Sequence, residues 1–98
     1  MAKVVWTERA TAWLGDIHAY VSQDNSIAAT RTVKAIQEKA LLLEKFPELG
    51  YKYEETSGRD VRILLYGHYR IAYDINDDGT IRILGVFHAA LDIERYLF

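Results

Sequence analysis

The residues with the greatest capacity for chemistry lie in the last third of the chain, at residues 61–98. Three arginines and one histidine occur there within runs of apolar residues: Arg62, Arg70, Arg82 and His88. A guanidinium group binds carboxylates and phosphates through paired hydrogen bonds, and an imidazole can give or take a proton near neutral pH. The direction in which each side chain points therefore decides what the protein can bind or catalyse.

Two alternating apolar and polar runs in this region are joined by Asn-Asp-Asp-Gly at residues 76–79. This sequence is typical of a hairpin turn and fits a three-residue loop closed by Gly79 in the left-handed region. That register pairs Asp74 with Arg82 and Arg70 with Val86. It also gathers most apolar side chains, including that of Phe87, on one face.

The strand before this hairpin can be assigned in the same way. If residues 66–68 form a loop, Val61, Ile63 and Leu65 face the core, while Arg62 and Leu64 join Arg70 on the other face. The sequence thus predicts an apolar face under the helices and an open face that carries the three arginines and His88. This open face is the predicted functional surface.

Each of these residues also has a structural alternative. Asp74 and Arg82 can form a cross-strand ion pair that stabilises the sheet. Arg62 and Arg70 can lie flat and cover the sheet with their aliphatic stems. His88, at the end of a strand, can serve the core rather than proton transfer.

The elements that position these residues follow from the periodicity of the apolar side chains. A strand at residues 3–6 precedes a helix that begins after Thr7, and a polar break at residues 22–25 separates this helix from a second one, from about Ser26 to the residue before Pro47. Three more strands follow near residues 61–66, 69–75 and 80–88. The order β-α-α-β-β-β with a short helix or tail predicts an α+β fold, in which a helical hairpin packs on one face of a small antiparallel sheet.

The composition limits the classes of function. Ninety-eight residues, half of them hydrophobic, are enough for a single domain spanning residues 1–98. The chain has no cysteine, a net charge of -2 and no run long enough to span a bilayer, which favours a cytoplasmic protein without disulfides or thiolate metal sites. A dedicated nucleic-acid binder normally carries a basic excess, so sequence-specific binding of nucleic acid is not expected.

In order and spacing, the motifs of the chain resemble those of the ParE/RelE superfamily of type II toxins. They are V-W-T-E-R-A, F-P-E-L-G, R-I-L-L-Y-G-H-Y-R-I-A-Y-D-I, the D-D-G turn, I-R-I-L-G-V-F-H and a D-x-x-R-x-L ending. The ending is more similar to the ParE branch than to the RelE branch. The resemblance covers almost the whole chain and implies a bacterial toxin that a small, ParD-like antitoxin neutralises.

The two branches differ in their targets, which are DNA gyrase for ParE and messenger RNA on the ribosome for RelE and YoeB. By family position, Arg70 matches the phosphate-binding arginine of the nucleases and His88 matches the histidine that YoeB-like toxins use as an acid. Ala89 stands where those enzymes place a tyrosine or arginine, and the lysines of RelE are absent. The resemblance therefore favours a gyrase inhibitor without catalytic residues. The alternative is a metal-free endoribonuclease that uses Arg70 and His88.

The same reading predicts two binding surfaces and no cofactor or metal. We expect the antitoxin to dock along the helices, on Trp13, Ile17, Tyr20, Val33 and Ile36. We expect the target to contact the open face and the tail, on Arg62, Arg70, Arg82, His88, Arg95 and Tyr96.

Overall fold

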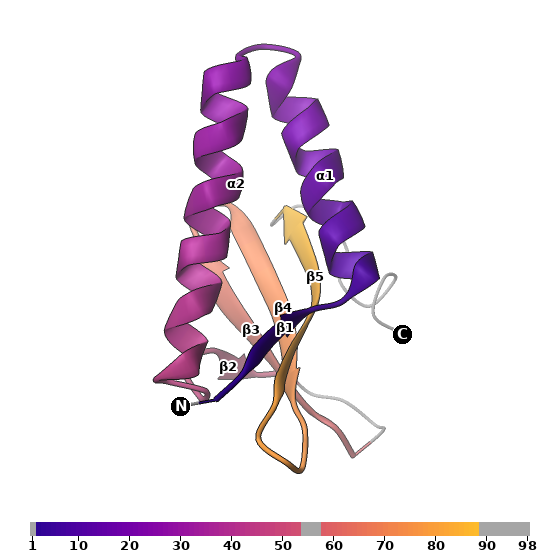
Figure 1. Cartoon of the computed structure of the whole chain (residues 1–98), viewed down its shortest axis with the longest axis vertical. Coiled ribbons are helices and arrows are strands. Elements are labelled where there is room, and N and C mark those ends of the chain that lie inside the picture. Colours follow the sequence, from indigo (N-terminus) through magenta and orange to yellow (C-terminus); the bar gives the residue numbers. More distant parts are fainter. Residues whose placement is uncertain (1, 54–57, 89–98) are drawn as a thin grey trace.

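The computed structural model describes residues 2–53 and 58–88, which form two helices packed on one face of a five-stranded sheet (Figure 1). The elements are β1 (Val4–Trp6), α1 (Glu8–Ser22), α2 (Ser26–Leu41), the 3-10 turn η1 (Leu42–Glu44), β2 (Tyr51–Lys52), β3 (Asp60–Tyr66), β4 (Tyr69–Ile75) and β5 (Ile81–His88). The strand order is β1-β5-β4-β3-β2. Strands β3, β4 and β5 pair in antiparallel fashion as predicted, and the short strand β2 adds antiparallel to β3 at one edge. At the other edge β1 pairs with β5 in parallel, so the sheet is mixed and not purely antiparallel as predicted. The predicted α+β fold is confirmed.

Side-chain caps set the start of each helix. Thr7 Oγ1 accepts a hydrogen bond from the Ala10 N–H at 3.1 Å, and Asn25 Oδ1 accepts one from the N–H three residues later at 3.0 Å. Each bond satisfies a donor that the first helical turn leaves unpaired. The Thr7 hydroxyl also donates to the Ile83 carbonyl at 2.7 Å, which fastens the start of α1 to β5. Neither helix in the described ranges has the length and apolar character of a membrane span.

Both faces of the sheet are apolar at its centre. On the helix face, which α1 and α2 cover, Ile71 and Ile83 are fully buried against side chains of both helices. On the opposite face, which we call the outer face, Ala72 and Phe87 belong to a second buried cluster. Trp13 reaches this second cluster from α1, with its ring edge-on to Phe87 and the ring centroids 5.3 Å apart. The sheet therefore buries side chains on both of its faces.

The turn between β4 and β5 is the predicted three-residue loop. The Asn76 N–H donates to the Thr80 carbonyl at 2.8 Å, and Gly79 has a φ of +87°. This left-handed conformation favours glycine because a side chain would be strained there. Asp74 lies opposite Arg82, as the sequence predicts.

Further along the same hairpin, Leu84 forms a bulge that the sequence reasoning missed. Leu84 has no opposite residue in β4, so Arg70 lies opposite Phe87 rather than opposite Val86. A one-residue shift in register moves each following side chain to the other face. Val86 therefore faces the helices and Phe87 faces outward, and the prediction that placed them the other way round is wrong.

The turn between β3 and β4 is tighter than predicted. Tyr66 pairs with Tyr69 across a turn of two residues, whereas the sequence reasoning assumed a loop of three. This difference again exchanges the two faces of a strand. Leu64 and Arg62 lie on the helix face, while Ile63 lies on the outer face, so the predicted faces of β3 are wrong.

A buried tyrosine holds the loop after the helices against the sheet. The Tyr73 hydroxyl donates to the Pro47 carbonyl at 2.8 Å and accepts a hydrogen bond from the Gly50 N–H at 2.9 Å. The Tyr73 side chain is fully buried, and this burial raises the pKa of its phenol. The Tyr73 hydroxyl thus fixes the loop between η1 and β2 through the Pro47 carbonyl and the Gly50 N–H.

We expect Tyr73→Phe to lower the free energy of unfolding by about 2 kcal/mol, because both backbone groups would lose a buried partner. Urea unfolding of the purified protein measures this change. The matched control is Tyr20→Phe, since Tyr20 is 75% exposed and its loss should cost less than about 0.5 kcal/mol. Equal stabilities of the two variants would contradict the role given to the Tyr73 hydroxyl.

Candidate functional site

The predicted open face does not exist as one surface, because the four residues assigned to it divide between the two sides of the sheet. Tyr69 lies opposite His88, and residues opposite one another in an antiparallel pair point to the same face. Arg70, the next residue, therefore points to the outer face, while His88 points to the helix face. The prediction that Arg70 and His88 share one surface is wrong, and the cause is the bulge at Leu84.

Arg82 lies on the outer face and forms the cross-strand ion pair with Asp74. Its Nε is 3.0 Å from Asp74 Oδ1, and its Nη2 is 2.6 Å from Oδ2. Arg59 Nη2 adds a second cation at 2.8 Å from the same Oδ2. Burial of Asp74 opposes its charged form, but the hydrogen bonds from Arg82 and Arg59 outweigh burial and hold the pKa of this carboxyl below its usual value. The structural alternative is thus the one observed for Arg82.

Arg59 is a member of this cluster that sequence reasoning missed. It lies two residues before Val61, and Val61 is the residue opposite Asp74. Residues two apart in a strand share a face, so the correct register of β3 would have placed Arg59 near Asp74. The alternation of side chains along β3 indicates this placement. The three-residue loop assumed between β3 and β4 instead put Arg59 and Asp74 on opposite faces of the sheet.

Arg62 also has a structural role. It donates from Nη1 to the Gly50 carbonyl at 3.2 Å and from Nε to Asp60 Oδ1 at 3.1 Å, and its Nη2 lies 3.9 Å from Glu48 Oε1. Only 15% of its side chain is exposed. The Arg62 guanidinium thus contacts the same loop that Tyr73 holds, through Gly50 and Glu48. Its hydrogen-bond donors are therefore largely occupied within the protein and unavailable to a target.

Arg70 is the arginine best placed to meet a target. It lies on the outer face near the start of β4, opposite Phe87, and is half-buried. Within residues 2–53 and 58–88, no carboxylate is paired with it, in contrast to Arg59, Arg62 and Arg82. Its guanidinium can therefore accept an anionic partner without breaking an ion pair within the described part of the chain.

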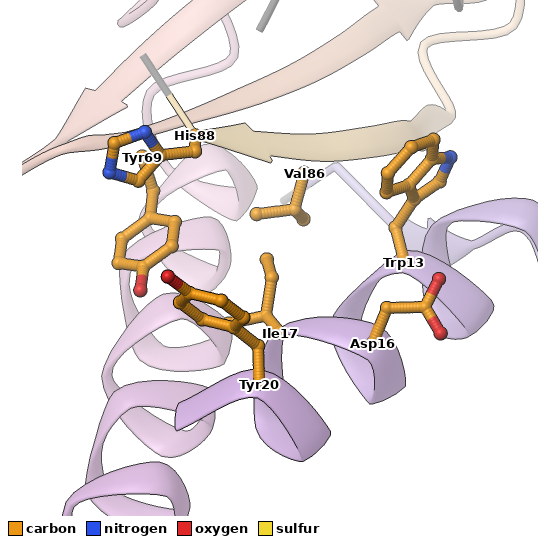
Figure 2. A pocket seen from close by; sticks show the side chains of 7 residues that line it. All are labelled: Trp13, Asp16, Ile17, Tyr20, Tyr69, Val86 and His88. Atoms are coloured by element: carbon orange, nitrogen blue, oxygen red, sulfur yellow. The ribbon is translucent and has the colours of Figure 1, made fainter. Parts of the chain in front are cut away.

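His88 lies instead at a hollow between α1, the start of β4 and the end of β5 (Figure 2). The hollow has a volume of about 510 Å³, within the range of roughly 300–1,000 Å³ that is typical of ligand pockets. Its lining residues are Trp13, Asp16, Ile17, Tyr20, Tyr69, Val86 and His88. The His88 ring is edge-on to Tyr69 with centroids 5.9 Å apart, and it stacks on His68 at 6.0 Å.

The hollow brings together three of the five residues predicted to bind an antitoxin. Trp13, Ile17 and Tyr20 follow one another at three- and four-residue steps on α1, so they lie on one side of that helix. Val33 packs partly buried against the core, and Ile36 is fully buried in it. These two α2 residues therefore contribute to the core, and the members of the predicted set that line the hollow are all on α1.

The remaining predicted site residues cannot be placed. Arg95 and Tyr96, together with the predicted tail, lie outside the described residues. Within the described ranges, no three His, Asp or Glu side chains are grouped as a metal site would require. The described site therefore consists of an apolar hollow with one carboxylate and one imidazole, and of an arginine on the other side of the sheet.

The hairpin-on-sheet fold also occurs in solved structures of toxin–antitoxin systems. The structure matches the chromosomal ParDE toxin–antitoxin system from P. aeruginosa with a TM-score of 0.73 and 25% identity, covering 90% of this chain and 96% of the other. It matches the RelBE2 toxin–antitoxin complex from Mycobacterium tuberculosis with a TM-score of 0.66 and 25% identity, covering 89% and 96% of the two chains.

Sequence comparison gives the family. Residues 4–93 match the model of the ParE toxin of the type II toxin–antitoxin system parDE. The chain is also 34% identical over 90 residues to the toxin RelE2 of Caulobacter vibrioides, which covers 92% of this chain and 98% of that protein. The chain belongs to the ParE toxin family within the ParE/RelE superfamily, and the resemblance drawn from the motifs is confirmed.

Proposed function

We propose that this type II toxin stops growth by binding DNA gyrase and that it does so without catalysis of its own. The observation that carries this proposal is the placement of Arg70 and His88 on opposite faces of the sheet. Metal-free RNA cleavage needs a cation at the phosphate and an acid at the leaving oxygen of the same bond. A pair separated by the sheet is poorly placed for those two tasks.

Family position supports the same choice. Ala89 and Ala90 follow His88, where the nuclease branch carries a tyrosine or arginine, and the net charge of -2 does not suit a ribosome-binding protein. In the proposed complex, Arg70 on the outer face contacts an acidic group of gyrase. The hollow on the other side of the sheet receives the antitoxin, so one copy of the toxin has distinct surfaces for its two partners.

A second candidate function, ribosome-dependent cleavage of messenger RNA, has its own support. The Caulobacter relative is named RelE2, and His88 has a second imidazole and a phenol as close neighbours. In that case His88 would act as the general acid, and Arg70 would contact the phosphate.

The decisive experiment combines two assays with two substitutions. We expect the purified toxin to inhibit gyrase supercoiling, and we expect Arg70→Ala to weaken that inhibition about tenfold or more, which corresponds to about 1.4 kcal/mol. Arg31→Ala is the matched control, because Arg31 is exposed on α2, on the side of the sheet away from Arg70, and should leave inhibition unchanged.

The same preparations should be tested for cleavage of ribosome-bound message. We expect no cleavage, and we expect His88→Ala to change gyrase inhibition less than about threefold. A cleavage activity that His88→Ala lowers by about a hundredfold or more would overturn the gyrase assignment in favour of the nuclease.

A further inference from the structure

The hollow beside α1 has a composition that suits a particular kind of side chain. Three aromatic residues line it from two elements: Tyr20 and Tyr69 lie at one end and Trp13 lies at the other end, on the same side as Asp16, with Ile17 and Val86 between them (Figure 2). Asp16, at its rim, is exposed. A guanidinium group stacks on aromatic faces and forms paired hydrogen bonds with a carboxylate, so it can use both parts of this lining at once.

The charges around the hollow favour a cation over an anion. Among the described lining residues, Asp16 is the single carboxylate, and no lysine or arginine is present. Asp16 also forms no ion pair with any residue in the described ranges, whereas Asp74 on the outer face is satisfied by two arginines. An incoming cation would therefore neutralise a carboxylate that has no partner within this part of the chain.

We propose that the hollow is a subsite for an arginine side chain of the antitoxin, with the guanidinium stacked on Trp13 and paired with Asp16. The stem of that arginine, with an apolar neighbour, covers Ile17 and Val86. Arginine fits better than lysine because its planar group stacks and binds a carboxylate through two hydrogen bonds, whereas an ammonium is a compact and strongly hydrated charge. This inference rests on the proposal that the antitoxin docks on this side of the sheet.

The two tryptophans allow the subsite to be tested without knowledge of the antitoxin sequence. Trp13 lines the hollow, whereas Trp6 packs in the core on β1 and serves as an internal reference. The probe is the tripeptide acetyl-Leu-Arg-Leu-amide, titrated into ¹⁵N-labelled toxin. Its control is the same peptide with citrulline, which is neutral and almost the same shape as arginine. The indole N–H resonances of the two tryptophans report binding.

We expect the arginine peptide to shift the Trp13 indole resonance and leave that of Trp6 unchanged, and we expect the citrulline peptide to bind at least about five times more weakly. Asp16→Asn should weaken binding of the arginine peptide by a similar factor and bring the two peptides to similar affinities. Asp24→Asn, on the exposed turn between the helices, is the matched control and should change nothing.

Equal binding of the two peptides, or an arginine peptide that binds Asp16→Asn as well as wild type, would overturn the subsite. A pull-down with the product of the neighbouring reading frame separates this failure from that of the broader proposal. If that protein binds the toxin and the peptides show no arginine preference, the antitoxin assignment stands and only the arginine subsite fails.

Discussion

Gly50→Ala is expected to lower the free energy of unfolding by about 3 kcal/mol or more. A Cβ at this position would lie 2.7 Å from the Ile63 carbonyl oxygen and 2.8 Å from Cε1 of Tyr73. The first of these obstacles is backbone in a central strand and cannot move aside cheaply, so the loop itself must shift. That shift would break the hydrogen bonds that Gly50 makes with Tyr73 and Arg62.

Gly15→Ala is the matched control, and its expected effect has the opposite sign. Gly15 is exposed within α1, and a Cβ there would meet no atom within 4 Å. Alanine in an exposed helix interior is more stable than glycine by about 0.5–1 kcal/mol. Chemical unfolding of both variants provides the measurement. A Gly50→Ala protein as stable as wild type would show that the loop does not lie against β3.

The second large effect concerns the carboxylate that two arginines share. Asp74→Asn should reduce the free energy of unfolding by about 3 kcal/mol at pH 7, because it removes the buried charge that Arg59 and Arg82 contact. The side chains of Arg59 and Arg82 are 40% and 42% exposed, so water can solvate their charges in part when the carboxylate is lost. The expected loss in the free energy of unfolding is therefore at the lower end of the range for breaking a buried ion pair.

The pH dependence gives an independent check on Asp74. Its pKa in the folded protein lies below the ordinary value of 3.8, so the carboxylate stabilises the fold fully above about pH 4 and loses this contribution as the pH falls further. The difference in stability between wild type and Asp74→Asn should thus be constant from pH 5 to 8 and shrink below pH 4. A difference that persists unchanged at pH 3 would exclude the charge as its source.

Much of the fold could be predicted because local signals were unambiguous. Thr7 and the polar break mark where the two helices begin. The helix end predicted from Pro47 is wrong, because α2 ends at Leu41 and the 3-10 turn η1 follows it. The spacing of Ala29, Ile36 and Ala40 identifies the buried side of α2. The Asn-Asp-Asp-Gly turn fixes the first pairs of the β4–β5 hairpin, including Asp74 with Arg82.

The faces of the strands could not be predicted, and the reason is physical. Register is well specified by sequence when one face is apolar and the other polar. Here both members of two neighbouring pairs are buried, one on each side of the sheet. Leu64 and Val86 lie on the helix face, and their neighbours Ile63 and Phe87 lie on the outer face. Burial therefore gives no preference between the two registers, and a one-residue difference at Leu84 was enough to separate His88 from Arg70.

The parallel pairing of β1 with β5 has a consequence for how the protein is made. Thr7 and the Ile83 carbonyl it contacts are 76 residues apart, so the first strand leaves the ribosome long before its partner. At roughly 5–20 residues per second, the delay is about 4–15 s. During that time β1 has no neighbouring strand, and α1 lacks β5, the strand through which it mainly contacts the sheet. A chain released before residue 81 lacks β5, which joins β1 to the rest of the sheet, and therefore cannot form this fold.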